Sequence, residues 1–410
     1  KDNVYDPLPL DDLLWVRTNE GAPRYAVYAV DPNQPERAKW KRVVAEHPED
    51  VLTDFNVIGG EVLVAYTHEV VSRLERFDQA GTSKGSVDLP TLGNSNGFAG
   101  LHDDSQAFFD FESFVTPPSI RRIDLRSGKV SVWKEVKADI ATDQFTVTAR
   151  KAKSKDGTLV PYLMVHKKDV SLTSKDNPTL LYGYGGFNVS LLPRFSRSTY
   201  AFIERGGISV QANLRGGGEF GEDWHRAGQL EKKQNVFDDF IAVAEDLTRS
   251  KVTRPARLAI HGRSNGGLLV AAALVQRPEL FAAAVSGVPL TDMLRYHQFQ
   301  IAKLWIPEYG SAEDPKQFEW LYAYSPYHHV RVGTPYPAVL LMTAESDTRV
   351  DPMHARKMAA ALQHAQASGR PILLRSELRA GHGAGKPISK IADEYADLFA
   401  FVLTELGRGE

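Results

Sequence analysis

The strongest constraint on the fold is the stretch 258–270, where a short apolar run meets a glycine-rich turn and then an alanine-rich segment. Residues 258–260 predict a buried strand, and residues 262–266 fit the pattern G-x-S-x-G around Ser264. The apolar segment that follows, through Phe281, predicts a helix. Glycine permits a sharp bend, and a serine at such a strand-to-helix turn presents its hydroxyl above the sheet. Ser264 is therefore the candidate nucleophile.

Length and composition favour a globular chain of two domains. The sequence has 410 residues, of which 42% are hydrophobic and 24% charged, so it can bury sizeable cores. A net charge of −2 without long runs of one sign gives no reason to expect a nucleic-acid or anionic-membrane partner. No apolar run is long enough to span a membrane. The absence of cysteine excludes disulfides, a cysteine nucleophile and thiolate metal sites.

Short β-rich runs separated by turns fill the chain from Leu13 to about Val136. They form groups that recur about every 40 residues, the period of four-stranded propeller blades. The predicted strands are 13–16, 25–30 and 41–44; 51–52, 62–66 and 72–77; and 98–101, 107–111, 120–124 and 130–133. For this region alone a propeller and a β-sandwich remain equally open. Because a closed propeller needs at least about four blades, the propeller hypothesis predicts further blades upstream of Lys1.

Strands alternate with helices in the remainder of the chain. A hairpin over 145–149 and 158–165 surrounds the turn at 156–157. Further strands are predicted at 179–182, 208–211, 258–260, 284–286, 338–342 and 372–374, and helical spacing is clearest over 235–248, 267–276, 352–366 and 388–406. This alternation predicts an α/β fold, a doubly wound and mostly parallel sheet with helices on both faces. We place the boundary so that residues 1–140 form the β domain and residues 141–410 the α/β domain.

A serine hydroxyl becomes nucleophilic only with a base within reach and an acid that orients the base. His382 lies in a glycine-rich loop after the predicted strand 372–374, and Glu345, Asp347 and Asp351 lie in a loop after the strand 338–342. Both loops follow strand carboxyl ends, the edge where open α/β sheets place their sites. The order serine, acid, histidine is that of α/β-hydrolases, but order alone does not separate the three acids.

Five motifs together resemble the prolyl oligopeptidase family of serine peptidases. They are YGYGGFN at 182–188, RGGGEFG at 215–221, SNGG at 264–267, DTRV at 347–350 and GHGAGK at 381–386. The resemblance extends from Phe145 to the C-terminus and implies an α/β-hydrolase domain. It also implies that the first third holds about three blades of a seven-bladed propeller. The remaining blades and an N-terminal segment of the hydrolase domain would then be truncated or lie on another chain.

The resemblance implies a role for each candidate catalytic residue. Ser264 would be the nucleophile, His382 the general base and acid, and Asp347 the orienting carboxylate. Glu345 and Asp351 then become ordinary loop residues. No metal or cofactor is implied.

The resemblance also implies the groups that would hold the substrate. The oxyanion hole would combine the backbone amide of Asn265 with the hydroxyl of Tyr184, and Arg349 would bind a substrate carbonyl. A proline at P1 would occupy an apolar slot with an aromatic ring stacked on it. The matching positions are Phe187, Trp305, Tyr309, Val350 and the side of Asn265.

These assignments predict a serine endopeptidase that hydrolyses short peptides on the carboxyl side of proline, acting as a monomer under a propeller that limits substrate size. Arg263 departs from the glycine common in prolyl members. Arginine there occurs in the oligopeptidase B branch, which cleaves after Arg or Lys and needs acidic pocket residues. We expect no acid beside Phe187 or Trp305, which favours proline.

Two alternatives remain at this stage. One is a sister activity on the same fold, such as an oligopeptidase B-like, dipeptidyl- or acylaminoacyl-peptidase or an esterase, because the fold does not decide among them. The other is a non-catalytic binding protein that contains a propeller.

Overall fold

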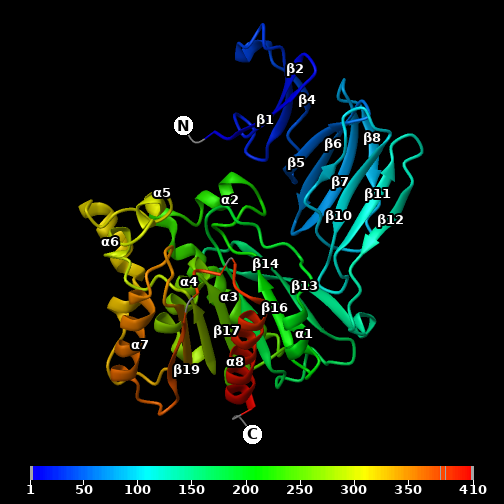
Figure 1. Cartoon of the computed structure of the whole chain (residues 1–410). Helices are drawn as coiled ribbons and strands as arrows, with labels where there is room; N and C mark the ends of the chain where they lie inside the picture. The colour runs from blue at the N-terminus through cyan, green and yellow to red at the C-terminus, as the bar shows by residue number, and fades with distance from the viewer. Residues whose placement is uncertain (1–2, 379, 384, 408–410) are drawn as a thin grey trace. The chain divides into compact units, whose positions relative to one another are not determined.

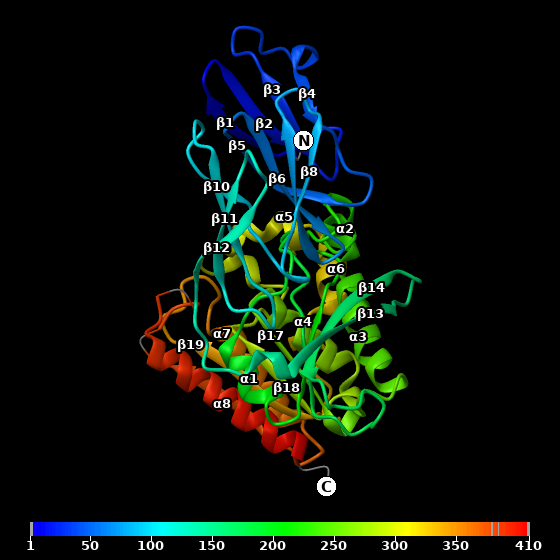
Figure 2. The same ribbon diagram turned by 90° about the vertical axis from the view of Figure 1, so that its right-hand side faces the viewer.

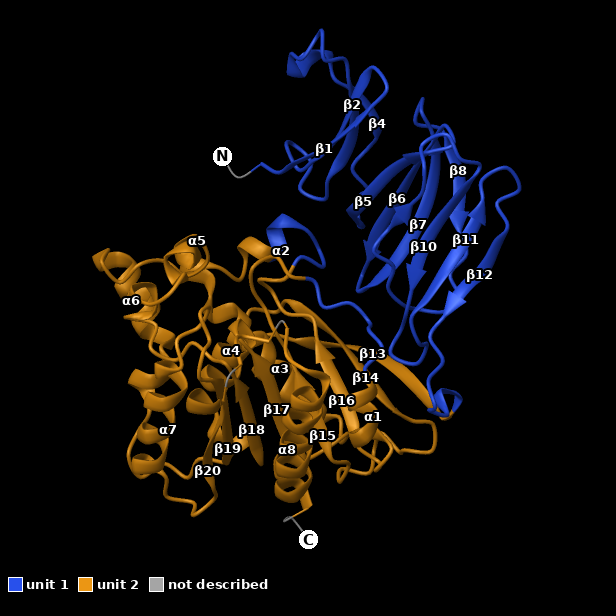
Figure 3. Ribbon diagram, viewed as in Figure 1, with its two compact units in different colours: residues 1–143, 190–196, 218–224 blue, residues 144–189, 197–217, 225–410 orange. Residues whose placement is uncertain are grey.

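The computed structural model describes residues 3–378, 380–383 and 385–407 and divides into two compact units (Figure 3). Unit 1 comprises Lys1–Asp143, Ser190–Ser196 and Gly218–Trp224, and unit 2 comprises Gln144–Val189, Arg197–Gly217 and His225–Glu410. Hydrogen bonds within unit 1 hold its two later segments. The Tyr25 hydroxyl donates to Glu222 at 3.0 Å, and the Phe195 amide donates to Glu112 at 2.9 Å.

Unit 1 consists of three four-stranded antiparallel sheets, each formed by consecutive strands. The first holds β1 (Tyr5–Leu10), β2 (Leu13–Thr18), β3 (Ala26–Val30) and β4 (Lys41–Val44). The second holds β5 (Val51–Ile58), β6 (Glu61–His68), β7 (Val71–Asp78) and β8 (Ser83–Val87). The third holds β9 (Phe98–Ala99), β10 (Gln106–Phe111), β11 (Ser119–Asp124) and β12 (Val130–Glu135). This repeat confirms the propeller prediction and removes the β-sandwich alternative.

The sequence did not reveal two strands, β1 and β8, and both lie at a sheet edge. β1 pairs only with β2 and carries Pro7 and Pro9, which an edge strand tolerates because it lacks a second neighbour. β8 pairs only with β7 and contains Gly85 among small polar residues, a composition of low β-propensity.

The middle sheet of unit 1 buries both of its faces, as the alternation along β6 shows. Val62, Val64 and Tyr66 pack in a core cluster with residues of the first sheet. Leu63 and Ala65 pack in a second cluster with residues of the third sheet. Since successive side chains of a strand point to opposite faces, each sheet is covered by the next along the chain.

Unit 2 is built on an eight-stranded sheet with the order β13-β14-β16-β15-β17-β18-β19-β20. The strands are β13 (Phe145–Lys153), β14 (Leu159–Lys167), β15 (Thr179–Tyr182), β16 (Ile208–Ala212), β17 (Leu258–Arg263), β18 (Ala283–Gly287), β19 (Ala338–Ala344) and β20 (Ile372–Glu377). β13 and β14 form the predicted hairpin, β14 pairs antiparallel with β16, and the pairs from β16 to β20 are parallel.

Helices cover both faces of this sheet, and in Figure 2 α8 and α3 flank it from opposite sides. The helices in Figure 1 are α1 (Arg197–Ile203), α2 (Glu222–Arg226), α3 (Gln234–Arg249), α4 (Asn265–Gln276), α5 (Ile306–Tyr309), α6 (Pro315–Tyr324), α7 (Met353–Ala365) and α8 (Ile388–Gly407). The predicted α/β architecture is confirmed. In the described part of the chain, no helix has both the length and the apolar character needed to cross a membrane.

The helix predicted through Phe281 is shorter than expected. α4 ends at Gln276, and Pro278–Leu280 forms a separate 3₁₀ turn. Proline cannot donate the next helical hydrogen bond, and the residue before it is driven out of the helical region. Arg277 accordingly has φ −141° and ψ 58°.

Close backbone approach defines the turn between β17 and α4. A Cβ added to Gly262 would lie 2.2 Å from the carbonyl oxygen of Gly266. One added to Gly266 would lie 2.7 Å from the oxygen of Gly183, and one added to Gly267 would lie 2.6 Å from the oxygen of Gly287. Each of these obstacles is backbone, so the turn has no room for side chains at its glycines.

We expect Gly262→Ala to destabilise unit 2 by about 1–3 kcal/mol, the usual cost of overpacking a close-packed site. Urea unfolding followed by circular dichroism measures the loss. Gly407→Ala is the matched control, because nothing lies within 4 Å of its added Cβ, and it should change stability by less than about 0.5 kcal/mol. A Gly262→Ala chain as stable as this control would contradict the steric explanation.

Candidate active site

Four loops that carry predicted site residues leave the same edge of the unit 2 sheet. β15, β17, β19 and β20 run parallel, with β18 between β17 and β19. The carboxyl ends of parallel strands meet at one edge, where α/β sheets place their ligands. Tyr184 follows β15, Ser264 follows β17, Asp347 follows β19 and His382 follows β20.

Ser264 occupies a strained backbone position at the start of α4. Its φ of 57° and ψ of −118° lie outside the regions that residues with a side chain prefer. Its amide donates to the Gly287 carbonyl at 2.8 Å, and its carbonyl accepts from the amides of Gly267 and Leu268. The side chain is only partly buried. The turn therefore fixes the backbone of Ser264 and leaves its hydroxyl accessible.

Asp347 is paired with His382. The His382 Nδ1 atom lies 2.8 Å from the Asp347 Oδ2 atom, and Asp347 is 2% exposed. The other carboxylate oxygen accepts from the amides of Arg349 and Val350, each at 2.9 Å. Burial acts to raise the pKa of Asp347, but the hydrogen bonds from His382 and the two amides lower it below its usual value. Asp347 therefore remains a carboxylate that can orient the imidazole.

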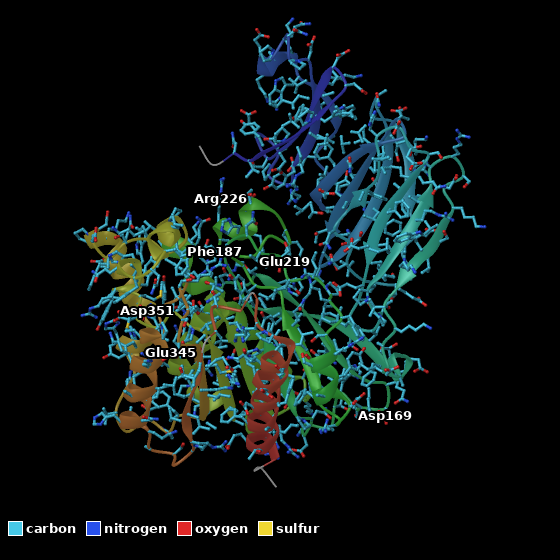
Figure 4. All side chains as sticks on the ribbon, in the orientation of Figure 1. Asp169, Phe187, Glu219, Arg226, Glu345 and Asp351 are labelled. Carbon is cyan, nitrogen blue, oxygen red and sulfur yellow. The ribbon has the colours of Figure 1, made fainter. Side chains whose placement is uncertain are left out.

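The other two acids of this loop are placed differently (Figure 4). The Glu345 side chain is exposed, and its backbone amide donates to the Glu377 carbonyl. Asp351 accepts from the amide of Met353 at the start of α7. The structure thus brings Asp347 to His382 and directs Asp351 to a helix end.

The structure does not bring Ser264 and His382 into hydrogen-bond contact. Within residues 3–378, 380–383 and 385–407, neither the Ser264 hydroxyl nor the Nε2 atom of His382 has a hydrogen-bond partner. Ala384, a member of the predicted GHGAGK motif, lies outside the described residues. A base and nucleophile are often separated in a free enzyme and approach when substrate is bound.

Tyr184 and Asn265 offer two hydrogen-bond donors beside Ser264. The amide of Asn265 opens α4, where helix N–H groups lack intrahelical acceptors, and no acceptor for it occurs among the described residues. Burial raises the pKa of Tyr184 to about 12, so its phenol keeps its proton at neutral pH. The Asn265 side chain donates to the Tyr184 carbonyl at 2.5 Å, which ties the two loops together.

Aromatic rings gather next to these donors. Phe187 lies edge-on to Trp305, with ring centres 6.5 Å apart, and edge-on to Tyr309 at 5.5 Å. Trp305 and Tyr309 belong to the same hydrophobic core as Val350, and Phe187 packs against that core. The Tyr309 hydroxyl donates to the Asn265 side chain at 2.8 Å. Phe187, Trp305 and Tyr309 therefore form one aromatic group that adjoins Asn265, and Val350 belongs to the same hydrophobic core.

Arg349 is exposed, in contrast to its neighbours Asp347 and Val350. Its charge acts on Tyr184, where it lowers the phenol pKa against the larger effect of burial. A positive charge in this position can attract a substrate carbonyl or a developing oxyanion.

The expectation that no acid lies beside Phe187 is wrong. The Phe187 amide donates to Glu308 Oε1 at 3.1 Å, and Glu308 is 5% exposed. The same oxygen accepts from the Lys233 ammonium at 3.0 Å, and Oε2 lies 2.9 Å from His225 Nε2. Burial would raise the pKa of Glu308, but Lys233, His225 and the Phe187 amide lower it to about 2.

Lys233 is a buried cation of the site that the sequence analysis did not identify. It is 1% exposed, and besides Glu308 it donates to the Gly185 carbonyl at 3.0 Å. Burial lowers the pKa of Lys233, whereas the charge of Glu308 opposes that shift. The one signal that the sequence offers for the partner of Lys233 is that Glu308 directly precedes Tyr309. Lys233 and Glu308 together hold the backbone of the loop that carries Tyr184 and Phe187.

His261 lies next to the turn but faces the core. It is 8% exposed, its Nδ1 atom lies 3.2 Å from the Val285 carbonyl, and burial lowers its pKa to about 4. It is therefore neutral at pH 7 and packs as a core residue of β17. Among the described residues, no group of three or more histidine or acidic side chains is arranged to hold a metal ion.

Comparison with known proteins identifies the family. The model described as prolyl oligopeptidase family matches residues 193–409, and that of its N-terminal beta-propeller domain matches residues 5–136. A prolyl endopeptidase of Elizabethkingia miricola is 39% identical over 397 residues, which cover 97% of this chain and 56% of the relative. Prolyl oligopeptidase A of Amanita bisporigera is 35% identical over 415 residues, covering 99% of this chain and 54% of the relative.

Solved structures agree with these matches. One, from a study of two prolyl endopeptidases and the role of inter-domain dynamics, has a TM-score of 0.97 at 45% identity and covers 99% of this chain and 60% of that one. Prolyl oligopeptidase B from Galerina marginata, bound to a 35mer substrate, has a TM-score of 0.93 at 33% identity and covers 99% and 58%. The chain spans just over half the length of the curated relatives it matches. It belongs to the prolyl oligopeptidase family of serine peptidases.

Proposed function

We propose that this chain is a serine endopeptidase that cleaves short peptides on the carboxyl side of proline. The observation that carries the proposal is the hydrogen bond between Asp347 and His382 at the same sheet edge as the strained Ser264. The assembly lies within unit 2. The relatives named prolyl endopeptidase support the substrate class.

The reaction follows from the roles of these groups. The Ser264 hydroxyl attacks the proline carbonyl while His382 Nε2 takes its proton, which requires the two atoms to come within about 2.6–3.2 Å. Asp347 holds Nδ1 and so leaves Nε2 as the base. The oxyanion accepts hydrogen bonds from the Asn265 amide and the Tyr184 hydroxyl. His382 then gives the proton to the leaving amine, and a water activated by His382 releases the acyl group.

Proline specificity rests on the apolar region formed by Phe187, Trp305, Tyr309 and Val350. Phe187, Trp305 and Tyr309 present aromatic rings against which a pyrrolidine can pack. The region offers no free charge, because the only acid that we place beside Phe187 among the described residues is Glu308, which is already paired with Lys233.

The second candidate is cleavage after Arg or Lys, and Glu308 is the observation that favours it. A basic P1 side chain would need a carboxylate oxygen with a free lone pair in a favourable direction. Glu308 already interacts with the Phe187 amide, Lys233 and His225 through its two oxygens. We therefore rank this activity second.

A panel of fluorogenic peptides with Pro, Arg or Ala at P1 tests the proposal on the 410-residue chain. We expect the highest kcat/KM for proline, and Ser264→Ala should lower kcat by about 10⁶-fold. The control is Ser171→Ala, which changes an exposed serine distant in sequence from Ser264 and should leave turnover unchanged. Preferred cleavage after arginine would favour the second candidate, and cleavage that survives Ser264→Ala would contradict the nucleophile.

Tyr184→Phe removes one proposed oxyanion donor and keeps the ring. We expect kcat to fall by about 10²–10³-fold with a small change in KM, because the hydrogen bond is made to charge that develops in the transition state. Tyr182→Phe, which removes a hydroxyl from the same segment, is the control and should retain activity. A Tyr184→Phe chain with normal kcat would show that the hole does not use this hydroxyl.

Trp305→Ala should raise KM for proline peptides by about tenfold or more, since a buried aromatic side chain contributes a few kcal/mol of apolar contact. Labelling of Ser264 by a small fluorophosphonate that lacks a P1 ring should keep its rate. Trp320→Ala changes the partly exposed tryptophan of α6 and serves as the control. Equal loss of peptide cleavage and of labelling would mean that Trp305 is structural.

A further inference from the structure

Arg263, the residue before Ser264, has no part in the reaction described above. Its guanidinium pairs with Glu394 on α8. The side chain is 28% exposed. An arginine beside the nucleophile therefore carries no indication of a basic substrate here.

Glu394 connects two parts of the site. Its Oε1 atom pairs with Arg263, and its Oε2 atom accepts from Lys386 at 2.5 Å. The side chains of Glu394 and Lys386 are 9% and 6% exposed. Burial acts to raise the pKa of Glu394, but Lys386 and Arg263 together lower it. The carboxylate thus remains charged and bridges the end of β17 to a residue of the loop that carries His382.

The described residues around His382, namely 378, 380–383 and 385–387, are called the histidine loop here, and α8 binds this loop near both ends. Lys390 of α8 donates to the Leu378 carbonyl at 2.5 Å, and Lys386 is bound by Glu394. The guanidinium of Arg263 lies 3.9 Å from the position that a Cβ would take at Gly383, the residue after His382. The Arg263 guanidinium therefore lies close to Gly383, and it is linked to Lys386 of the loop through Glu394.

We propose that Arg263 and Glu394 are positioning residues that set the placement of His382 relative to Ser264. The inference rests on the proposed function, since it concerns the base of that reaction. Arg263 is joined to Ser264 by one peptide bond, so a bridge from its side chain to the histidine loop links nucleophile and base through a short path. Charges that are largely removed from water must keep their partners, because an unpaired buried charge costs several kcal/mol. The network therefore favours one position of the loop.

Steady-state kinetics test the consequence for catalysis with a proline peptide. Arg263→Gln should lower kcat by about 10–100-fold, the effect of a misplacement of about 1 Å, while KM changes by less than about twofold. Arg263→Lys keeps the charge and should recover part of the rate. Glu394→Gln should match Arg263→Gln, and the double variant should be no worse than the more impaired single variant, because both changes break one network.

Hydrogen exchange followed by mass spectrometry tests the bridge without requiring turnover. Arg263→Gln and Glu394→Gln should increase exchange in peptides that cover the histidine loop. Arg257→Gln is the matched control, because Arg257 binds the Leu406 carbonyl near the other end of α8. It should leave both the loop and kcat unchanged even if it lowers stability.

The outcomes separate this inference from the proposed function. Unchanged exchange in the histidine loop of Arg263→Gln would overturn the bridge, and so would a KM increase at constant kcat. A kcat loss of equal size in Arg257→Gln would reduce Arg263 to a general structural role. A parent chain without peptidase activity would contradict the proposed function, whereas the exchange experiment would still decide the bridge.

Discussion

The site depends on how closely two stretches of backbone approach at the turn between β17 and α4. With the carbonyl of Gly266 only 2.2 Å from where a Cβ of Gly262 would stand, the strand and helix meet in a way that only glycine permits. The same geometry forces Ser264 to a φ of 57° and leaves the first amide of α4 without an acceptor among the described residues. It also places the side chain of Asn265 between the Tyr184 carbonyl and the Tyr309 hydroxyl. One steric constraint thus positions the candidate nucleophile, a donor and part of the pocket.

Two loops at the site lie beyond the hydrogen-bonded strands of the sheet and are bound by charged side chains instead. The loop after β15 is bound by Lys233 and Glu308, and the histidine loop by Glu394 and Lys390 of α8. Loops lack the regular backbone ladder of a sheet, so their polar groups need other partners. A buried ion pair adds little net stability compared with a well-packed apolar pair, yet removing one partner is costly. Such pairs therefore contribute mainly to the definition of loop geometry.

The sequence predicted the parallel strands of unit 2 from short apolar runs that alternate with helical patterns, and β17, which α4 follows, is the clearest case. It missed β1 and β8, since edge strands tolerate proline and small polar residues that weaken the pattern. The resemblance to the family selected Asp347 over Glu345. In the structure Asp347 is buried and bonded to His382, whereas Glu345 is exposed. The acid beside Phe187 was missed because Glu308 follows it by 121 residues, and the position of Glu308 next to Tyr309 was the only sequence signal for it.

Glu308 also shows why an acid near a pocket does not by itself decide substrate charge. What matters is whether its oxygens are free to accept a hydrogen bond from a ligand, and here each already has a protein partner. Lys233, which is 1% exposed, compensates the negative charge of Glu308. A cationic substrate side chain could bind Glu308 only if this buried pair separated. Under the proposed function a proline ring would need no such partner, because it would gain from apolar contact with Phe187 and Trp305. The same holds for Arg263, because its positive charge is paired with Glu394 on α8. Both charged residues that would suggest a basic substrate are thus engaged in holding loops, which supports an uncharged P1 residue.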